Sequence, residues 1–183
     1  MVKNVMLREF LKNYRRTGTI TPSSPSLIKK MLAPINFDKA RCIVELGAGE
    51  GCITRALLRK MNHETKLISF EQNPEIFNEL NNIQDSRLAK VNDSAENIQQ
   101  HLQNQGFEKA DYIVSGLPLV FLPKEEGEAI INQAKANLHQ DGKFIQFQYS
   151  LKSLKDFKQK FAKVKVTFTL WNIPPAFVYS CKI

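Results

Sequence analysis

The stretch Cys42-Ile-Val-Glu-Leu-Gly-Ala-Gly-Glu-Gly51 decides the fold of this chain. An apolar run that ends in an acid is followed by three glycines that alternate with other residues, and helical character begins at Cys52. Glycine permits the unusual backbone angles of a tight turn and lets a ligand approach the main chain closely. The free N–H groups at a helix start favour a negatively charged ligand group. The stretch therefore predicts a strand, a ligand-binding turn and a helix.

Two classes of ligand use such a turn. A dinucleotide fingerprint has the spacing G-x-G-x-x-G, whereas the third glycine here, Gly51, comes one residue early. The spacing E-x-G-x-G-x-G resembles the first motif of class I S-adenosylmethionine methyltransferases. That resemblance implies a methionine-type ammonium group near Glu45 and a backbone cradle at Gly47, Gly49 and Gly51. The alternative is a glycine-rich turn that binds nothing.

Length and composition limit the fold class and the kinds of partner that this chain can have. The 183 residues suit one α/β domain, and a hydrophobic content of 43% is enough for a proper core. A formal charge of +8 favours an anionic partner, either nucleic acid or an acidic membrane surface, without choosing between them. No apolar run approaches membrane-spanning length, and Arg8 and Glu9 interrupt any signal-peptide core.

The cysteines and histidines give no metal-binding pattern. Cys42, Cys52 and Cys181 are widely spaced, so we expect ordinary reduced thiols in a cytosolic protein and no bound metal. Each of the three histidines is isolated and close to a predicted helix end or loop, so we expect solvated surface positions for all of them. They are His63, His101 and His139.

Hydrophobic periodicity predicts alternating strands and helices. Strands are expected at residues 42–46, 66–71, 87–91, 111–115, 143–149, 164–171 and 176–181. Helices are expected at residues 3–16, 26–31, 52–61, 74–82, 95–104, 124–138 and 150–161. Strands separated by helices and then a terminal strand pair predict a mostly parallel sheet with an antiparallel end. The fold class is therefore α/β and Rossmann-like, with seven strands, one of them antiparallel, and helices on both faces.

The predicted helix at residues 3–16 is amphipathic. Its apolar stripe consists of Leu7, Phe10, Leu11 and Tyr14, and basic residues surround it. It either lies on anionic lipid as an interfacial helix or packs its stripe on the domain, and one helix can do both in turn. We expect residues 1–35 to form an N-terminal helical lid or membrane-contact segment.

Polar residues follow the second and third predicted strands. Glu71, some twenty residues past the glycines, can accept both ribose hydroxyls of a nucleoside, and we assign its neighbour Gln72 to the same site. The alternative for Glu71 is a solvated strand-end carboxylate. Asp93 or Ser94 could meet the adenine edge, or could cap the helix at 95–104, and for Ser94 the cap is favoured.

A stiff apolar loop follows the fourth predicted strand. It reads Gly116-Leu-Pro-Leu-Val-Phe-Leu-Pro123, and its two prolines are expected to stop any helix before Lys124. Open α/β sheets bind ligands at this position, beyond the carboxyl ends of the strands. The loop is either a simple apolar connector or a contact for an apolar ligand, and its composition favours the contact.

The pattern Ser115-Gly-Leu-Pro118 resembles that of the bacterial phospholipid N-methyltransferases, soluble enzymes that methylate phosphatidylethanolamine or related aminolipids. Nucleobase methyltransferases commonly carry N/D-P-P-Y or N-L-P-Y there. Residues 16–24 and 172–178 also resemble that family, as does Gln146-Phe-Gln-Tyr149, although the family usually has threonine where Gln148 stands. The family is similar to rRNA adenine dimethyltransferases, but this short chain has no added RNA-binding domain, which weakens an RNA interpretation.

The resemblance implies a single methyltransferase domain over residues 1–183, cytoplasmic and peripherally bound to an anionic membrane. It would transfer methyl groups from S-adenosylmethionine, with S-adenosylhomocysteine as product, to the amine of an aminolipid. The alternatives are an rRNA or nucleobase adenine N-methyltransferase and a small-molecule methyltransferase, so nucleic acid is the less favoured partner.

The implied site residues fall into three groups. Those expected at the cofactor are Thr19, Ile20, Thr21, Glu45, Gly47, Gly49, Gly51, Glu71, Gln72, Asp93, Ser94 and Ser115. Those expected at the acceptor are Tyr14, Gly116, Leu117, Pro118 and Tyr149. Ser115 and Tyr149 are the candidate catalytic residues.

The attacking amine must be neutral. Water, a lipid phosphate or Tyr149 could remove its proton, and the sequence leaves these three open. The rings of Tyr14, Tyr149 and Phe147 could hold a methylammonium group by cation–π attraction, although core packing is favoured for Phe147.

Overall fold

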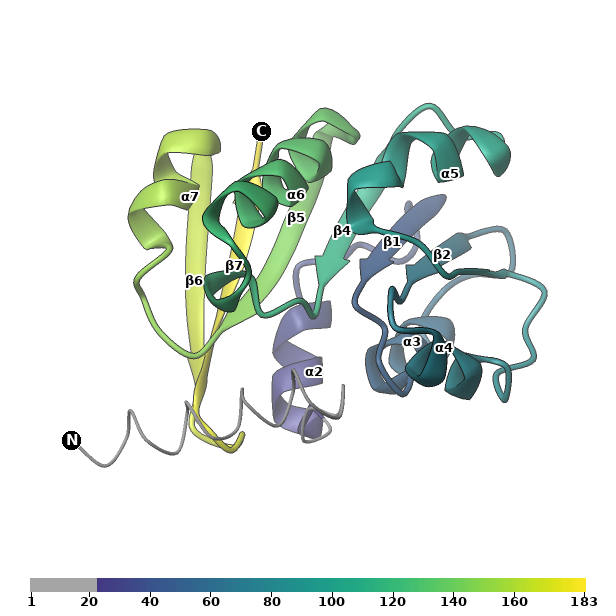
Figure 1. Ribbon diagram of the computed structural model, residues 1–183, viewed down its shortest axis with the longest axis horizontal. Coiled ribbons are helices and arrows are strands. Elements are labelled where there is room, and N and C mark those ends of the chain that lie inside the picture. The colour runs from purple at the N-terminus through teal and green to yellow at the C-terminus, as the bar shows by residue number, and fades with distance from the viewer. Residues whose placement is uncertain (1–22) are drawn as a thin grey trace.

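Seven strands form one sheet in the computed structural model, which describes residues 23–183 (Figure 1). They are β1 (Cys42–Leu46), β2 (Lys66–Phe70), β3 (Leu88–Val91), β4 (Ala110–Ser115), β5 (Leu138–Gln148), β6 (Lys163–Thr169) and β7 (Ala176–Lys182). The strand order is β3-β2-β1-β4-β5-β7-β6, and only β7 runs antiparallel to its neighbours. The predicted fold class and the single antiparallel strand are confirmed. As a result, β1 to β6 all end at one edge of the sheet, called here the carboxyl edge.

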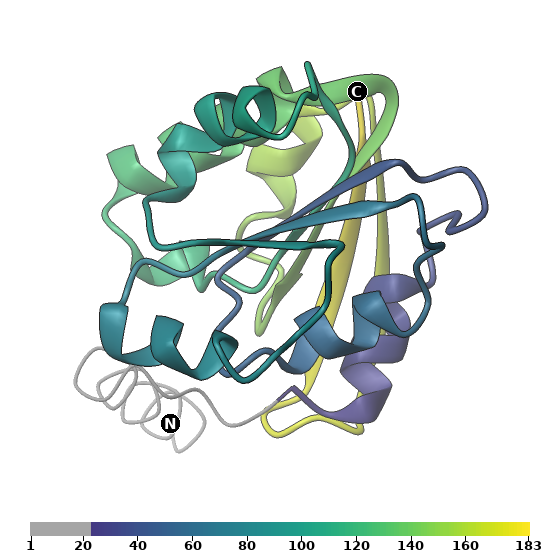
Figure 2. The ribbon, with the colours of Figure 1, turned by 90° about the vertical axis from the view of Figure 1, so that its right-hand side faces the viewer.

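Helices cover both faces of the sheet (Figure 2). One face packs against α2 (Pro25–Leu32), α3 (Cys52–Leu58) and α4 (Pro74–Leu80). The other face packs against the short helix η1 (Ala95–Asn97), α5 (Ile98–Asn104), the short helix η2 (Leu119–Phe121), α6 (Lys124–Ala136) and α7 (Leu154–Lys160). Every residue of β1 is buried, because a central parallel strand is covered on both sides.

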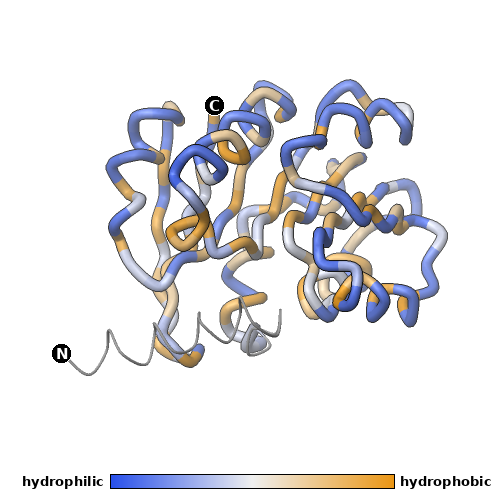
Figure 3. The backbone as a smooth tube through the Cα atoms, viewed as in Figure 1, coloured by the Kyte–Doolittle hydropathy of each residue, from blue (hydrophilic) through white to orange (hydrophobic). Residues whose placement is uncertain are grey.

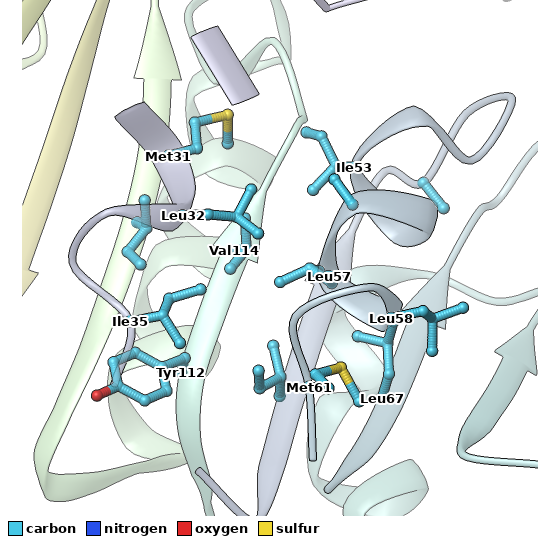
Figure 4. Packing of buried hydrophobic residues seen from close by; sticks show 14 of the residues in the cluster. Met31, Leu32, Ile35, Ile53, Leu57, Leu58, Met61, Leu67, Tyr112 and Val114 are labelled. Carbon is cyan, nitrogen blue, oxygen red and sulfur yellow. The ribbon is translucent and has the colours of Figure 1, made fainter. Parts of the chain in front are cut away.

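The core beneath α2 and α3 shows why these segments form helices. Leu27, Met31 and Leu32 of α2 are buried, at the spacing of one helix face. They belong to a cluster that includes Leu57 of α3 and Val114 of β4, and Figure 4 shows part of this packing. The cluster joins α2 to the strands that carry the candidate site.

Most boundaries lie within a few residues of the prediction, and three differences have physical causes. The helix expected at 95–104 begins as the separate turn η1. The loop after β4 contains η2, because a three-residue 3₁₀ turn fits between the two prolines that exclude an α-helix. Strand β6 ends at Thr169 rather than at Trp171, so Leu170 and Trp171 lie in the exposed turn before β7.

The predicted helix at 3–16 lies outside the described residues, as do Tyr14, Thr19, Ile20 and Thr21. Within residues 23–183, no helix combines the length and the apolar character needed to cross a bilayer.

Candidate active site

The glycine loop after β1 folds back on the end of β2. Gly47, Gly49 and Gly51 have φ of 73°, 55° and 83°, in the left-handed region that favours glycine. The N–H groups of Gly47 and Ala48 both donate to the carbonyl of Phe70, at 2.9 Å each, and that of Gly49 donates to Glu71 Oε2 at 2.9 Å. These three N–H groups are therefore not free to bind a ligand, because the end of β2 already accepts from them.

A cavity of about 580 Å³ opens at the carboxyl edge of β1, β2 and β4. Its polar wall includes four acids, and none of the described residues that line it is basic. The lining residues are Gly47, Phe70, Glu71, Gln72, Asn73, Pro74, Glu75, Ile76, Asp93, Ser94, Ala95, Leu117, Leu122, Glu126 and Ile130. The structure thus brings six predicted site residues to one cavity.

Glu71 is fixed at this cavity by the start of α4. Its Oε1 accepts from the N–H of Asn73 at 3.0 Å, while Oε2 holds Gly49. Asn73 in turn caps α4, accepting from the N–H groups of Glu75 and Ile76, and Pro74 occupies the first turn. The Asn92 side chain donates to the carbonyl of Glu71 at 2.8 Å. Glu71 is therefore positioned rigidly and still has unused lone pairs.

Asp93 and Ser94 line the cavity, but both already have partners. Ser94 Oγ accepts from the N–H of Glu96 and so caps η1, as favoured from the sequence. The Asp93 carboxylate accepts from Asn97 Nδ2 and lies 2.9 Å from His101 Nε2. The hydrogen bond from His101 is the main cause that lowers the pKa of Asp93.

The prediction of a solvated surface position is wrong for His101. Its side chain is 21% exposed and packs edge-on against Phe70, with ring centroids 5.2 Å apart. Phe70 lines the cavity. This contact could not be predicted, because the two rings lie 31 positions apart in the chain and on different elements.

Glu45 is fully buried and is not part of the cavity wall. Its Oε2 accepts from Thr54 Oγ1 at 2.6 Å and from Ser69 Oγ at 2.7 Å, so it joins β1 to α3 and β2. Its Oε1 has no hydrogen-bond partner among the described residues. Burial raises the pKa of Glu45 to about 7, against the opposing effect of the hydrogen bonds. The structure therefore gives this acid a buried position within β1, and its place near a methionine-type ammonium group stays a prediction.

The loop after β4 contacts the glycine loop. The N–H of Gly116 donates to the carbonyl of Leu46 at 2.8 Å. A Cβ on Gly116 would lie 2.8 Å from the carbonyl oxygen of Gly47, and a Cβ on Gly47 would lie 2.7 Å from the Leu117 side chain. Glycine is therefore required on both sides of this contact, and Leu117 is held at the cavity.

One serine and one glutamine side chain, both buried, hold the loop after β4 by hydrogen bonds. Ser115 is fully buried, and its hydroxyl accepts from the N–H of Leu117 at 3.3 Å, so it does not reach the cavity wall. Gln146 of β5, also fully buried, donates to the carbonyl of Leu117 at 2.9 Å. Pro118 is buried as well. The sequence indicates Gln146 only as part of a family pattern, and its contact with Leu117 depends on the folded sheet.

Tyr149 lies apart from the cavity wall. It packs on the α2 side of the sheet, edge-on to Phe147 with ring centroids 5.5 Å apart. Burial raises the pKa of its phenol to about 12, and a hydrogen bond with the Asn172 side chain opposes that rise. The phenol therefore stays protonated at neutral pH. Phe147 is buried in the core, as favoured from the sequence.

Comparison with known proteins identifies the chemistry. Residues 18–169 match the family described as the methyltransferase small domain. The ornithine lipid N-methyltransferase of Singulisphaera acidiphila is 30% identical over 181 residues, which cover 97% of this chain and 94% of that protein.

Solved structures agree with the fold. The O-methyltransferase from Bacillus cereus in complex with SAH has a TM-score of 0.71 and 16% identity, covering 97% of this chain and 90% of that one. An rRNA methylase from Streptococcus thermophilus has a TM-score of 0.61 and 16% identity, covering 87% of this chain and 97% of that one. At such identities the likeness concerns the fold alone. With the family match over most of its length, the chain belongs to the methyltransferase small domain family and is an S-adenosylmethionine-dependent methyltransferase.

Proposed function

We propose that this methyltransferase transfers methyl groups to the amine nitrogen of an aminolipid, such as an ornithine lipid or phosphatidylethanolamine, at a membrane surface. The observation that carries the proposal is the similarity to an ornithine lipid N-methyltransferase, which extends over 97% of the chain. The match is therefore not confined to the glycine loop, which methyltransferases of many substrates share.

The cavity at the carboxyl edge fits the methyl donor. Its volume of about 580 Å³ lies in the usual range for small-molecule sites. A Cβ built on Gly49 would meet no described atom within 4 Å, so a ligand can approach the main chain there. The free lone pairs of Glu71 support its proposed role as acceptor of the ribose hydroxyls, and the apolar side chains of Phe70, Leu117 and Ile130 suit the adenine.

The charge of the cavity suits the reaction. S-adenosylmethionine supplies a methyl group that is already activated on a positively charged sulfonium, and the acceptor is an amine. Glu71, Glu75, Asp93 and Glu126 surround the cavity with negative charge, which favours cationic ligands. The same acids favour the charged donor over a product that is neutral at sulfur.

The chain's own residues align the reactants and exclude water. Leu117 forms an apolar wall of the cavity next to the glycine loop, in a segment stiffened by Pro118 and held by Gly116 and Gln146. Such a wall keeps the nucleophile desolvated and in line. The raised pKa of Tyr149 argues against its phenol as the base that deprotonates the amine. Water and the lipid phosphate remain the proposed proton acceptors.

The test is incubation with labelled S-adenosylmethionine and separately extracted lipids, RNA and small amines, followed by purified phosphatidylethanolamine and ornithine lipid. We expect label in the amine headgroup of lipid, and loss of that label with Glu71→Ala. Label confined to RNA would overturn the proposal in favour of a nucleobase acceptor. Label confined to the small amines would favour a small-molecule acceptor.

A further inference from the structure

We propose that the turn between β6 and β7, residues 170–175, is a membrane-insertion element that enters the bilayer beside the active site. This turn is called the hairpin tip below. The inference rests on the proposed function, since it assumes a lipid acceptor, and it assigns membrane contact to side chains for which neither the comparisons nor the sequence patterns give a role.

The hairpin tip presents three large apolar side chains to solvent. Leu170 is 70% exposed, Trp171 is 83% exposed and Ile173 is 78% exposed. Hydrophobic colour is visible at this turn in Figure 3. No charged residue occurs between Lys165 and Lys182, in a chain of which 24% is charged. Several large apolar side chains gathered on one turn indicate a binding surface rather than scattered exposure.

The polar side chain of the tip is satisfied within the protein. Asn172 is only 5% exposed, and its Oδ1 accepts from the N–H of Ser24 at 3.1 Å. Its Nδ2 donates to the carbonyl of Pro174 at 2.7 Å. Pro174 and Pro175 have no N–H to satisfy. Because unsatisfied polar groups are the main penalty inside a bilayer, the paired amide of Asn172 and the two prolines reduce the cost of moving the tip out of water.

The tip is also held in place. Asn172 connects it to the start of α2, and Ser26 Oγ lies 2.8 Å from Thr169 Oγ1 at the end of β6. Asn172 is turned inward, so its neighbours Trp171 and Ile173 are left outside. A fixed turn inserts its side chains without a further ordering cost.

The position of the tip suits a lipid substrate. β6 ends at the carboxyl edge of the sheet, where β1, β2 and β4 also end and the cavity opens. Figure 1 shows the β6–β7 turn at the same end of the molecule as the arrowhead of β4. Leu151, 46% exposed, follows β5 at this edge. Insertion of the tip would therefore turn the active-site edge toward the membrane.

A bilayer fits this surface better than a protein partner does. The tip is a single projecting turn, and a deformable lipid surface accepts such a shape without a matching groove. Trp is enriched at membrane interfaces, where its ring is apolar and its N–H reaches polar groups. The formal charge of +8 draws the whole chain toward anionic lipid.

The experiment uses Trp171 as its own reporter, since it is the only tryptophan of the chain. The full-length protein is titrated with phosphatidylethanolamine–phosphatidylglycerol vesicles, with and without brominated acyl chains. We expect a blue shift of Trp171 emission on the vesicles and quenching by the brominated lipid.

Two double variants test the surface while keeping the reporter. Leu170→Asp with Ile173→Asp adds two negative charges at exposed positions of the tip, and we expect vesicle partitioning to fall at least tenfold. His139→Asp with Gln140→Asp adds two negative charges at exposed positions near the amino ends of the strands, and should leave partitioning within twofold of wild type. Methylation of vesicle lipid should follow partitioning, whereas methylation of the same lipid in detergent micelles should stay within twofold.

Three outcomes would overturn the inference, and a fourth would overturn the proposed function alone. Vesicle binding with unchanged Trp171 emission would assign the contact to another part of the chain. A blue shift that depends on protein concentration without lipid would assign the tip to a second copy. Methylation of lipid in detergent micelles, without insertion of Trp171 into vesicles, would support the proposed function and contradict the membrane role of the hairpin tip. Insertion of the tip without methylation of any aminolipid would support the membrane role of the hairpin tip and contradict the proposed function.

Discussion

Two cavities of opposite charge lie on this domain. The cavity at the carboxyl edge is lined by Glu71, Glu75, Asp93 and Glu126, and none of the described residues around it is basic. A second cavity, of about 420 Å³, lies between the end of α2 and strands β5, β7 and β6. Five lysines and no acid are among its described lining residues, namely Lys30, Lys143, Lys163, Lys165 and Lys182. A net charge of +8 therefore says little about the charge at either place.

The basic cavity arises from strand register. Lys182 of β7 lies directly opposite Lys143 of β5 on one side and Lys163 of β6 on the other. Like charges directly opposite each other destabilise a sheet. The repulsion among these lysines is partly relieved, because Lys182 pairs with Asp141 at 2.8 Å and Lys143 donates to the carbonyl of Pro34. In the acidic cavity, in contrast, backbone N–H groups hold Glu71, and the side chains of Asn97 and His101 hold Asp93.

The largest expected effect tests the acidic cavity. Glu71→Ala should weaken binding of S-adenosylmethionine by about 2–4 kcal/mol, because charge-assisted hydrogen bonds are lost and the Gly49 N–H loses its acceptor. Titration calorimetry measures this. Glu75→Ala is the matched control, since that side chain is exposed on the same wall, and it should cost far less. Equal losses of binding free energy in both variants would mean that the negative charge of the cavity, and not the hydrogen bonds of Glu71, holds the ligand.

The next effect concerns the acid buried beneath that cavity. The pKa of Glu45 is raised from 4.5 to about 7 in the folded protein, so the native state binds its proton more tightly than the unfolded state does. Stability should therefore fall as pH rises from 4.5 to about 7, by about 3 kcal/mol in total.

Glu45→Gln should flatten this dependence, because the amide resembles the protonated carboxyl. Denaturant unfolding of both proteins between pH 5 and pH 8 measures it. The variant should also bind S-adenosylmethionine better than Glu71→Ala does, since Glu45 is not in the cavity wall. A steeper pH dependence in the variant than in wild type would contradict the assignment.

The smallest effect tests the basic cavity. Lys163→Gln should raise stability at low salt by about 0.5 kcal/mol, because it removes a charge directly opposite Lys182. For a domain of this size that is a rise of about 1–2 °C in the unfolding temperature, and it should vanish at high salt. Lys155→Gln, at an exposed position of α7, is the control and should change little. An effect that persists at high salt would point to packing instead of charge.

The fold was predictable because its signals are local. The alternation of apolar strands with helices predicted the sheet, and the glycine spacing with Glu71 predicted where the cavity lies. The side-chain contacts were not predictable, because they join residues far apart in the chain. Glu45 stands in a motif that resembles a ligand contact, yet Ser69 and Thr54 hold it in the interior. His101 reaches Phe70, and Gln146 reaches Leu117, only once the sheet is formed.

Strand periodicity also misplaced one boundary with a functional consequence. Leu170 and Trp171 continue the β-branched and aromatic pattern of residues 164–169, so the sequence predicts a strand through Trp171. Asn172 instead forms hydrogen bonds with Ser24 and Pro174, which closes the turn two residues earlier and leaves the apolar side chains outside.

The lysines of β6 have a further effect on how copies of this protein meet. β6 is the last strand on its side of the sheet, and such an edge carries unpaired backbone groups that can template aggregation. A second copy approaching that edge would bring its own Lys163 and Lys165 against the same row of charge. At the opposite edge, β3 is only four residues long. The charge that lowers stability in the basic cavity thus protects a protein with an exposed apolar turn from precipitating through its sheet.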